Sequence, residues 1–193
     1  MNPHYLSPAE TAKLIRARLK KVFPRTKFSV RSDSYSGGGS VRVKWMDGPA
    51  ATLVESIVES YAGGRFDGSI DMKISVRHWL LPDGTVRVAS NPGTQGSMGY
   101  IAEEREWMPD PDCKLVSFGA DFIFTSRTIS PAFAEKIMAR LIRKGLPENT
   151  LQIDKRDNGE AGIVRRLGVN FDDARYWERQ ASVEQSRFMV AGA

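Results

Sequence analysis

KFSVRSDSYSGGGSVRVKW, residues 27–45, sets how the first part of this chain folds. Apolar and polar residues alternate on both sides of the triple glycine at 37–39, which is the pattern of two half-buried β-strands. The glycines are interpreted as supplying positive φ and conformational freedom to a long hairpin loop. This loop is unlike a phosphate-binding loop, because it lacks the Gly-Lys-Ser/Thr ending and joins two strands rather than a strand and a helix.

A helix is predicted immediately before this hairpin. Ser7-Pro8-Ala9-Glu10 has the pattern of a capping box with proline at the first helical position. Ala12, Ile15, Leu19 and Val22 then form one apolar stripe, and Pro24 ends the helix. A second helix is predicted after the hairpin, over residues 51–61.

The middle of the chain is rich in predicted strands. Alternation indicates one strand over residues 72–80, a turn at Pro82-Asp83-Gly84 and a return strand through Val86 and Val88. A glycine-rich loop at 91–99 and an acidic patch at 103–106 follow. Residues 115–128 are expected to form either one bent strand or two short strands around Gly119.

The last part of the chain is predicted to repeat the first. Ser130-Pro131 begins a helix, strands follow near residues 151–153 and 163–167, and a last helix runs from Asp172 or Asp173 to about Phe188. At an offset of 123 residues, identical residues recur, such as Ser7 and Ser130, Lys13 and Lys136, and Arg42 and Arg165. A duplicated helix–strand–strand–helix unit explains this, and so does convergent use of common capping residues.

These patterns predict an α+β fold, in which antiparallel sheets pack with about four helices. We expect an N-terminal α+β unit with the central hairpin over residues 1–129. A second helix–strand–strand–helix unit is expected over residues 130–193, packed with the first as one compact domain.

The charge distribution is uneven. No acidic residue occurs from Thr11 to Ser32, although this segment holds eight lysines and arginines. The remaining 20 basic residues face all 23 acidic ones, so the positive surplus of the chain, +5 overall, lies in one segment. A clustered basic surface is typical of proteins that bind a phosphate backbone or an acidic protein surface. The alternative is a solvated helix that uses Lys and Arg as good helix formers.

Composition excludes several classes of protein. No run approaches the ~18 apolar residues of a membrane span, and the N-terminus lacks the features of a secretion signal. Cys113 is the only cysteine, so an intrachain disulfide and a cysteine-cluster zinc site are excluded. The single cysteine is typical of a reducing compartment, and we expect a cytoplasmic protein.

Candidate catalytic residues are few. Asp67 and Asp71, or Asp110 and Asp112, have the spacing to hold a hard cation or to act as acid and base, but Asp67-Gly68 is more simply a turn. His78 is expected to be a core or edge histidine rather than a ligand. We therefore expect no enzyme activity, no metal and no cofactor.

Several segments resemble a large polyvalent-protein-associated domain, the twenty-ninth of that series. The resemblance is carried by YLSPAETAKLIRARLKKVFP, the hairpin at residues 27–45, YAGGRFDGSIDM and SFGADFIFTSRTIS, and it covers most of residues 5–145. Domains of this series occur in phage and conjugative-plasmid proteins, often beside antirestriction modules. The resemblance therefore implies a mobile-element protein, and it supplies no catalytic residues.

Three functions are consistent with the sequence. The first is a non-catalytic inhibitor, of the anti-CRISPR or antirestriction type, that binds a host defence protein or ribonucleoprotein complex. The second is an accessory that binds DNA or RNA of the element, and the third is a metal-dependent nuclease using Asp67 and Asp71. The expected basic face consists of Lys13, Arg16, Lys20, Lys21, Arg25, Lys27, Arg31, Arg42 and Lys44, with Tyr35, Ser36 and Gly37 in the adjoining loop.

Overall fold

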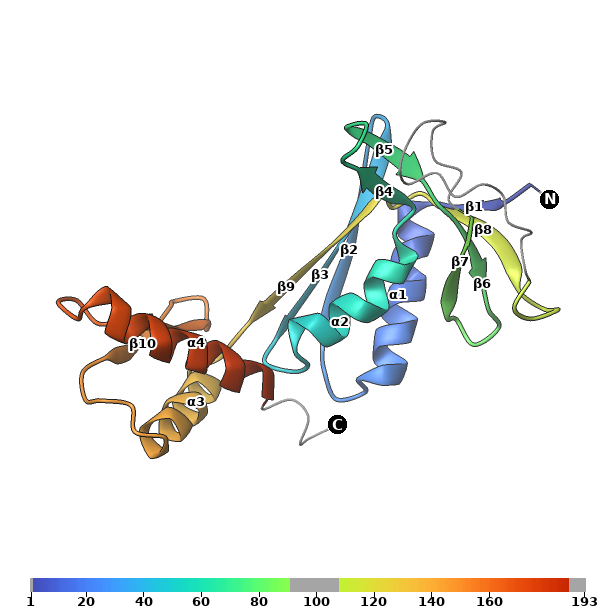
Figure 1. Cartoon of the computed structure of the whole chain (residues 1–193). Helices are drawn as coiled ribbons and strands as arrows, with labels where there is room; N and C mark the ends of the chain where they lie inside the picture. The colour runs from blue at the N-terminus through green and yellow to red at the C-terminus, as the bar shows by residue number, and fades with distance from the viewer. Residues whose placement is uncertain (1, 91–107, 188–193) are drawn as a thin grey trace. The chain divides into compact units, whose positions relative to one another are not determined.

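The computed structural model describes residues 2–90 and 108–187, and within these it is an α+β protein, as predicted (Figure 1). The loop at 91–99 and the acidic patch at 103–106 lie outside the described residues. The elements of the first half are β1 (His4–Leu6), α1 (Pro8–Val22), β2 (Phe28–Tyr35), β3 (Gly38–Met46), α2 (Ala51–Val58), the 3₁₀ helix η1 (Glu59–Tyr61), β4 (Gly64–Asp67), β5 (Met72–Ser75), β6 (Arg77–Leu80) and β7 (Val86–Ser90). The second half contains β8 (Lys114–Phe118), β9 (Phe122–Thr128), α3 (Pro131–Arg143), β10 (Leu151–Lys155), β11 (Ala161–Arg165) and α4 (Phe171–Arg187).

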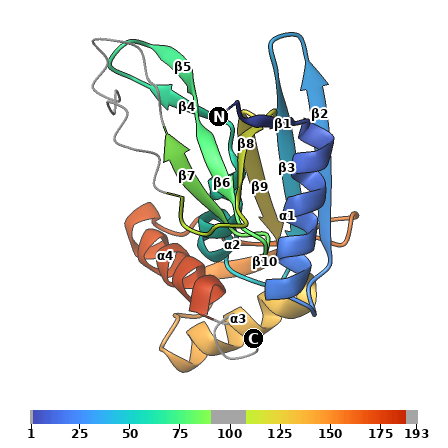
Figure 2. The same cartoon turned by 90° about the vertical axis from the view of Figure 1, so that its right-hand side faces the viewer.

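The strands form four sheets among the described residues. Their orders are β1-β8-β6-β7, β2-β3-β9, β4-β5 and β10-β11. Figure 2 shows β6 between β7 and β8, and it is antiparallel to both, whereas β1 is parallel to β8. The hairpin predicted at Pro82-Asp83-Gly84 is therefore confirmed, and residues 115–128 form two strands rather than one bent strand.

The chain divides into two compact units. The first comprises Met1–Pro24, Phe28–Val43 and Val54–Thr125, and the second comprises Arg25–Lys27, Lys44–Leu53 and Ser126–Ala193. Each unit is assembled from separate segments of the chain. The predicted division into residues 1–129 and 130–193 stays a prediction.

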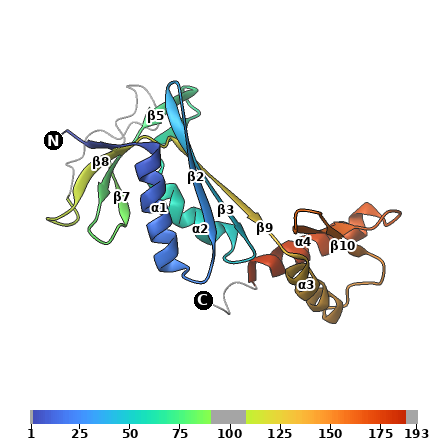
Figure 3. The ribbon, with the colours of Figure 1, turned by 180° about the vertical axis from the view of Figure 1, so that it is seen from behind.

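The core of the first unit lies between α1, α2 and the sheet β2-β3-β9. Figures 1 and 3 show both helices on the same side of this sheet. Ile15 and Leu19 of α1, Val41 and Val43 of β3, and Val54 of α2 are completely buried. The capping box predicted for α1 is present, because the backbone N–H of Ser7 donates to Oε2 of Glu10 at 2.8 Å while the Ser7 side chain accepts from the Glu10 N–H.

The core of the second unit lies between α3, α4 and the hairpin β10-β11. Ile137 and Leu141 of α3, Leu151 of β10 and Ala181 of α4 belong to one buried cluster. Arg127 links two segments of this unit, because its guanidinium donates to the carbonyl oxygens of Asp47 and Gln185 at 2.8 and 3.1 Å. None of the helices in residues 2–90 and 108–187 combines the length and the apolar character that a membrane crossing requires.

Two predicted elements differ from those observed. The strand expected over residues 72–80 is interrupted at Val76, whose N–H donates to the Gly63 carbonyl at 2.9 Å, so that β5 and β6 join different sheets. The long loop expected around the triple glycine is a two-residue turn at Ser36 and Gly37, because β3 already begins at Gly38.

Candidate functional site: an open sheet face

The turn between β2 and β3 places two arginines opposite each other. Gly37 has φ 88°, which favours glycine, and it forms the turn with Ser36. A two-residue turn fixes the register of a hairpin, and Arg31 then faces Arg42 while Val30 faces Val43. Val30 and Val43 are buried and both arginines are exposed, as this register requires.

The arginine pair has no acidic partner among the described residues. No carboxylate of that part of the chain lies within ion-pair distance of Arg31 or Arg42. Like charges directly opposite on a sheet are destabilising. Such a local conflict in an otherwise consistent fold is typical of a functional surface.

The hairpin of the second unit differs in this respect. There Lys155 lies 3.1 Å from Glu135, and Arg156 lies 3.9 Å from Asp154 and 3.5 Å from Glu160. The uncompensated pair therefore belongs to the first hairpin, although both hairpins follow a capped helix.

Two phenylalanines of β9 extend the same face of the sheet. Thr125 of β9 donates to Glu55 of α2 at 2.7 Å, so its side chain lies on the helix-covered side. Side chains alternate along a strand, which turns Phe122 and Phe124 to the other side, where Arg31 and Arg42 lie. The two rings are 37% and 53% exposed, and their centroids are 6.4 Å apart. We call the surface formed by Arg31, Tyr35, Arg42, Phe122 and Phe124 the open face.

The tip of the hairpin is held by an ion pair. Lys73 of β5 lies 2.8 Å from Asp121 and also donates to the Gly37 carbonyl at 3.4 Å. A Cβ added at Gly38 would lie 2.0 Å from Oδ2 of Asp121, so glycine allows this close approach. Tyr35 is 49% exposed beside it, and its hydroxyl donates to the Gly39 carbonyl at 3.4 Å.

These elements lie within the part of the chain that comparison with known protein families matches. Residues 6–130 match the family of large polyvalent protein associated domain 29, which confirms the resemblance seen in the sequence. The chain belongs to this family. Membership associates it with phages and other mobile genetic elements. Neither the curated proteins nor the solved structures gave a match.

In this member of the family, the predicted basic face is divided between two sides of the sheet. Lys13, Arg16 and Lys20 share one side of α1 because they are three and four residues apart. Arg16 also donates to the Val30 carbonyl at 2.8 Å. Arg31, Arg42 and, further along β3, Lys44 alternate with buried residues and point away from the helices. Their role in binding stays a prediction.

The remaining predicted cations occupy other surroundings. Lys21, with Arg18, lies near the turn between β6 and β7. Hydrogen bonds from Thr85 lower the pKa of Asp83 in this turn, and the charges of Arg18 and Lys21 lower it further. Arg25 and Lys27 are exposed in the connection between α1 and β2, and Ser36 is exposed in the turn.

Sequence reasoning missed the two phenylalanines and the Lys73–Asp121 pair. The alternation of Phe122, Ile123 and Phe124 shows that the phenylalanines share a face of β9, but it does not show which face the helices cover. The exposed aromatic component of the site therefore required the three-dimensional structure.

The candidate acidic pairs serve as local turn formers. Oδ1 of Asp67 accepts from the Ser69 N–H and hydroxyl at 2.9 and 2.6 Å, and Asp71 is exposed with φ 51°. Asp110 accepts from the Asp112 N–H at 2.8 Å. Within residues 2–90 and 108–187, no three His, Cys, Asp or Glu side chains are grouped so as to hold a metal ion.

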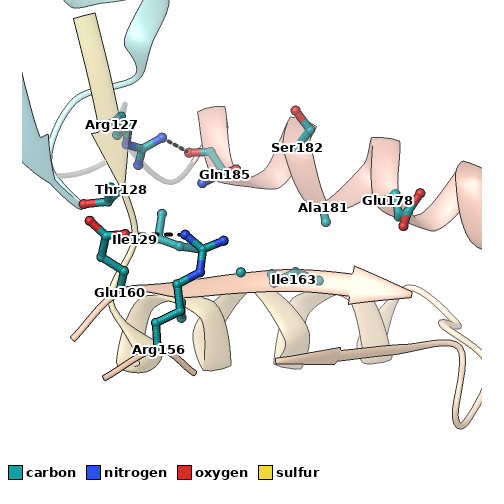
Figure 4. Close-up of a pocket in the computed structure, with 12 residues that line it drawn as sticks. Arg127, Thr128, Ile129, Arg156, Glu160, Ile163, Glu178, Ala181, Ser182 and Gln185 are labelled. Atoms are coloured by element: carbon teal, nitrogen blue, oxygen red, sulfur yellow. Dashed lines mark hydrogen bonds and ion pairs between the residues drawn. The ribbon is translucent and has the colours of Figure 1, made fainter. Parts of the chain in front are cut away.

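The second unit contains a cavity of about 350 Å³ beside α4, shown in Figure 4. Arg127 at its edge bonds the Gln185 carbonyl, and Arg156 pairs with Glu160. Two of the charged groups that line it, Arg127 and Arg156, are therefore engaged with the protein itself. The pairing favours a structural role for these side chains.

Proposed function

We propose that this chain is a mobile-element protein that acts by stoichiometric binding rather than catalysis, and that it blocks a host defence complex of the CRISPR or restriction type. The observation that carries the proposal is the exposed Arg31–Arg42 pair, which has no acidic partner in the described part of the chain. Such a pair is stabilised when an anionic surface covers it. Nucleic-acid-handling defence machines offer such surfaces.

Two further observations support binding over chemistry. The acidic residues with suitable spacing are held in turns by their own neighbours. His78 is 2% exposed, so its ring is not accessible to a substrate that approaches from solvent. Neither arrangement places an acid, a base and a nucleophile around a common substrate position.

The test is a plaque assay. Expression of the chain is expected to raise phage plaque counts in a strain with an active defence system and to leave them unchanged in the matched strain without it. The variant Arg31→Glu/Arg42→Glu should lose this effect. Arg165→Glu, at the equivalent position of the second hairpin, is the matched control and should retain it. No rise in any of the defence-proficient strains tested would refute the proposal.

A biochemical arm identifies the partner. The tagged chain should capture components of the defence system from the lysate, and capture should survive nuclease treatment. The charge-reversed variant should not capture them.

A second candidate is an accessory that binds the element's own DNA or RNA. It is favoured by the exposed rings of Phe122 and Phe124 on the same face as the arginines. Recovery of nucleic acid without a defence component, with no change in plaque counts, would support this candidate over the first.

A further inference from the structure

We propose that the open face binds single-stranded nucleic acid, with unpaired bases stacked on Phe122 and Phe124 and the backbone phosphates held by Arg31 and Arg42. This inference goes beyond the proposed function and names a ligand for the surface that favours the second candidate. It shares the two arginines with the proposed function and otherwise does not depend on it.

The spacing of the face suits a strand of nucleic acid. The sheet order is β2-β3-β9, so the row that contains Arg42 directly borders the row of phenylalanines. Neighbouring strands are about 4.8 Å apart, which puts Arg31 about 10 Å from the phenylalanine row. A base on the rings therefore has cations within reach of its flanking phosphates.

The rings are arranged to accept planar ligands. Phe122 and Phe124 are tilted by 30° to each other at 6.4 Å, and both are exposed. Exposed neighbouring aromatic rings on a sheet are otherwise unfavourable surface. A base stacked on such a ring typically contributes about 1–3 kcal/mol, whichever base it is.

The geometry favours a single strand over a duplex. Bases in a duplex hide their faces in the stack, so the rings would have nothing to stack on. Among the described residues, this face is built by the strands β2, β3 and β9, and no helix of the open face is available to enter a groove. An acidic protein segment would satisfy the arginines but would leave the rings without a specific partner.

The face offers little for reading base sequence. Ser40, which faces the same way as Arg42 on β3, is 5% exposed, and Asp33 is the acidic residue on this side of β2. The Asp33 carboxylate repels phosphate, so the backbone is expected to pass the arginine pair rather than the tip. We expect weak sequence preference and binding of both DNA and RNA.

The test is fluorescence anisotropy with labelled oligonucleotides at ~50 mM salt. The probes are a 15-nucleotide oligo-dT, the matching oligo-U and a 15-base-pair DNA duplex. We expect both single strands to bind more tightly than the duplex. Phe122→Ala/Phe124→Ala should weaken single-strand binding by at least about thirtyfold, because two stacks are lost. Equal affinity for the duplex, or no effect of the double variant, would overturn the proposal.

Matched variants separate stacking from charge and from unfolding. Phe122→Leu/Phe124→Leu keeps apolar area without aromatic rings and should also lose affinity, whereas Phe124→Trp should retain it. Tyr176→Ala removes an aromatic ring of α4 that is 56% exposed and should change nothing. Arg31→Gln/Arg42→Gln should lower the slope of log K against log salt by about 1.4, or 0.7 per phosphate contact.

Two outcomes distinguish this inference from the proposed function. If the oligonucleotides fail to bind while nuclease-resistant capture persists, the inference fails alone. If they bind as expected while plaque counts stay unchanged, the proposed function fails alone. A poly-glutamate peptide that matches oligo-dT in affinity and is insensitive to the phenylalanine variants would also overturn the inference.

Discussion

His78 is a buried residue whose ionisation makes the first unit sensitive to acid. Its ring lies 5.0 Å from that of Phe118, and burial lowers its pKa to about 4 from 6.5. In the unfolded chain His78 becomes protonated below about pH 6.5, whereas in the folded protein it stays neutral until the pH approaches its pKa of about 4. The contribution of neutral His78 to the free energy of unfolding is therefore fully present above pH 6.5. It falls as the pH decreases towards 4, by about 3 kcal/mol at most.

Urea unfolding at a series of pH values checks this expectation. The loss of stability between pH 6.5 and pH 4 should be smaller in His78→Leu than in the wild type. His4→Leu, which changes an exposed histidine, should behave like the wild type. Parallel pH profiles for the wild type and His78→Leu would contradict the assignment.

Glu184 is a buried carboxylate that pairs with two cations, Arg140 and Lys144, which are not buried. Its side chain is 2% exposed, while those of Arg140 and Lys144 are 41% and 42% exposed. The hydrogen bond from Lys144 is the main cause that lowers the Glu184 pKa, and the bond from Arg140 adds to it. The consequences of breaking the cluster should therefore depend on which side is removed.

Arg140→Met/Lys144→Met removes two cationic partners from a carboxylate whose side chain is 2% exposed, and it should reduce the free energy of unfolding by about 3–5 kcal/mol. Glu184→Gln leaves two cations that water can solvate and should cost about 1–2 kcal/mol. Thermal and denaturant unfolding at pH 7 measures both. Equal losses in the two variants would contradict the expected asymmetry between the carboxylate and its cations.

Some elements pack so closely that only glycine fits at the point of contact, as at Gly63. A Cβ added at Gly63 would lie 1.8 Å from the Phe118 carbonyl oxygen, a backbone atom that cannot move aside cheaply. Five residues later, a Cβ at Gly68 would meet nothing closer than 3.9 Å. Gly63→Ala should therefore lose at least about 2–3 kcal/mol, and Gly68→Ala should stay within about 0.5 kcal/mol of the wild type. Denaturant unfolding of the two variants gives a matched comparison, which similar stabilities would contradict.

The surroundings of Gly63 show which features of helices and strands can be predicted from sequence patterns and which cannot. The capping box at Ser7 and the alternation in β2 and β3 are local, so they predicted α1 and the hairpin correctly. The break at Val76 arises because its N–H pairs with Gly63 of a preceding segment, and alternation contains no information on that partner. Likewise, the triple glycine was interpreted as backbone freedom, which holds for Gly37, whereas Gly38 gives room to Asp121.

The candidate site was predictable to a similar extent. The cations are visible in the sequence, and the cluster of positive charge between Thr11 and Ser32 includes Arg31 but not Arg42. Their division between a helix side and an open side follows from burial of Val41 and Val43, which is a tertiary property.

At the scale of the whole molecule, the same order of elements occurs twice with different surfaces. α1 and α3 begin at Pro8 and Pro131, and β2 and β10 begin at Phe28 and Leu151; both pairs are 123 residues apart. Both helices have a serine N-cap followed by proline. Lys155 and Arg156 of the second hairpin have ion-pair partners, whereas Arg31 and Arg42 of the first have none in the described part of the chain. This contrast is why we assign binding to the first copy.

The positive surplus charge of the first helix–strand–strand–helix copy should attract a polyanionic ligand over a distance as well as by direct contact. Lys13 and Lys20 lie on α1, which packs on the covered side of the sheet, so they do not share the open face with Arg31 and Arg42. Their field should still attract a polyanion. Lys13→Gln/Lys20→Gln is therefore expected to slow association with oligo-dT about two- to fivefold at ~20 mM salt and to leave dissociation unchanged. Stopped-flow measurements at ~500 mM salt supply the control, because screening should then abolish the difference. Faster dissociation of this variant would instead mean that α1 itself touches the ligand, and the binding surface would have to extend around the edge of β2.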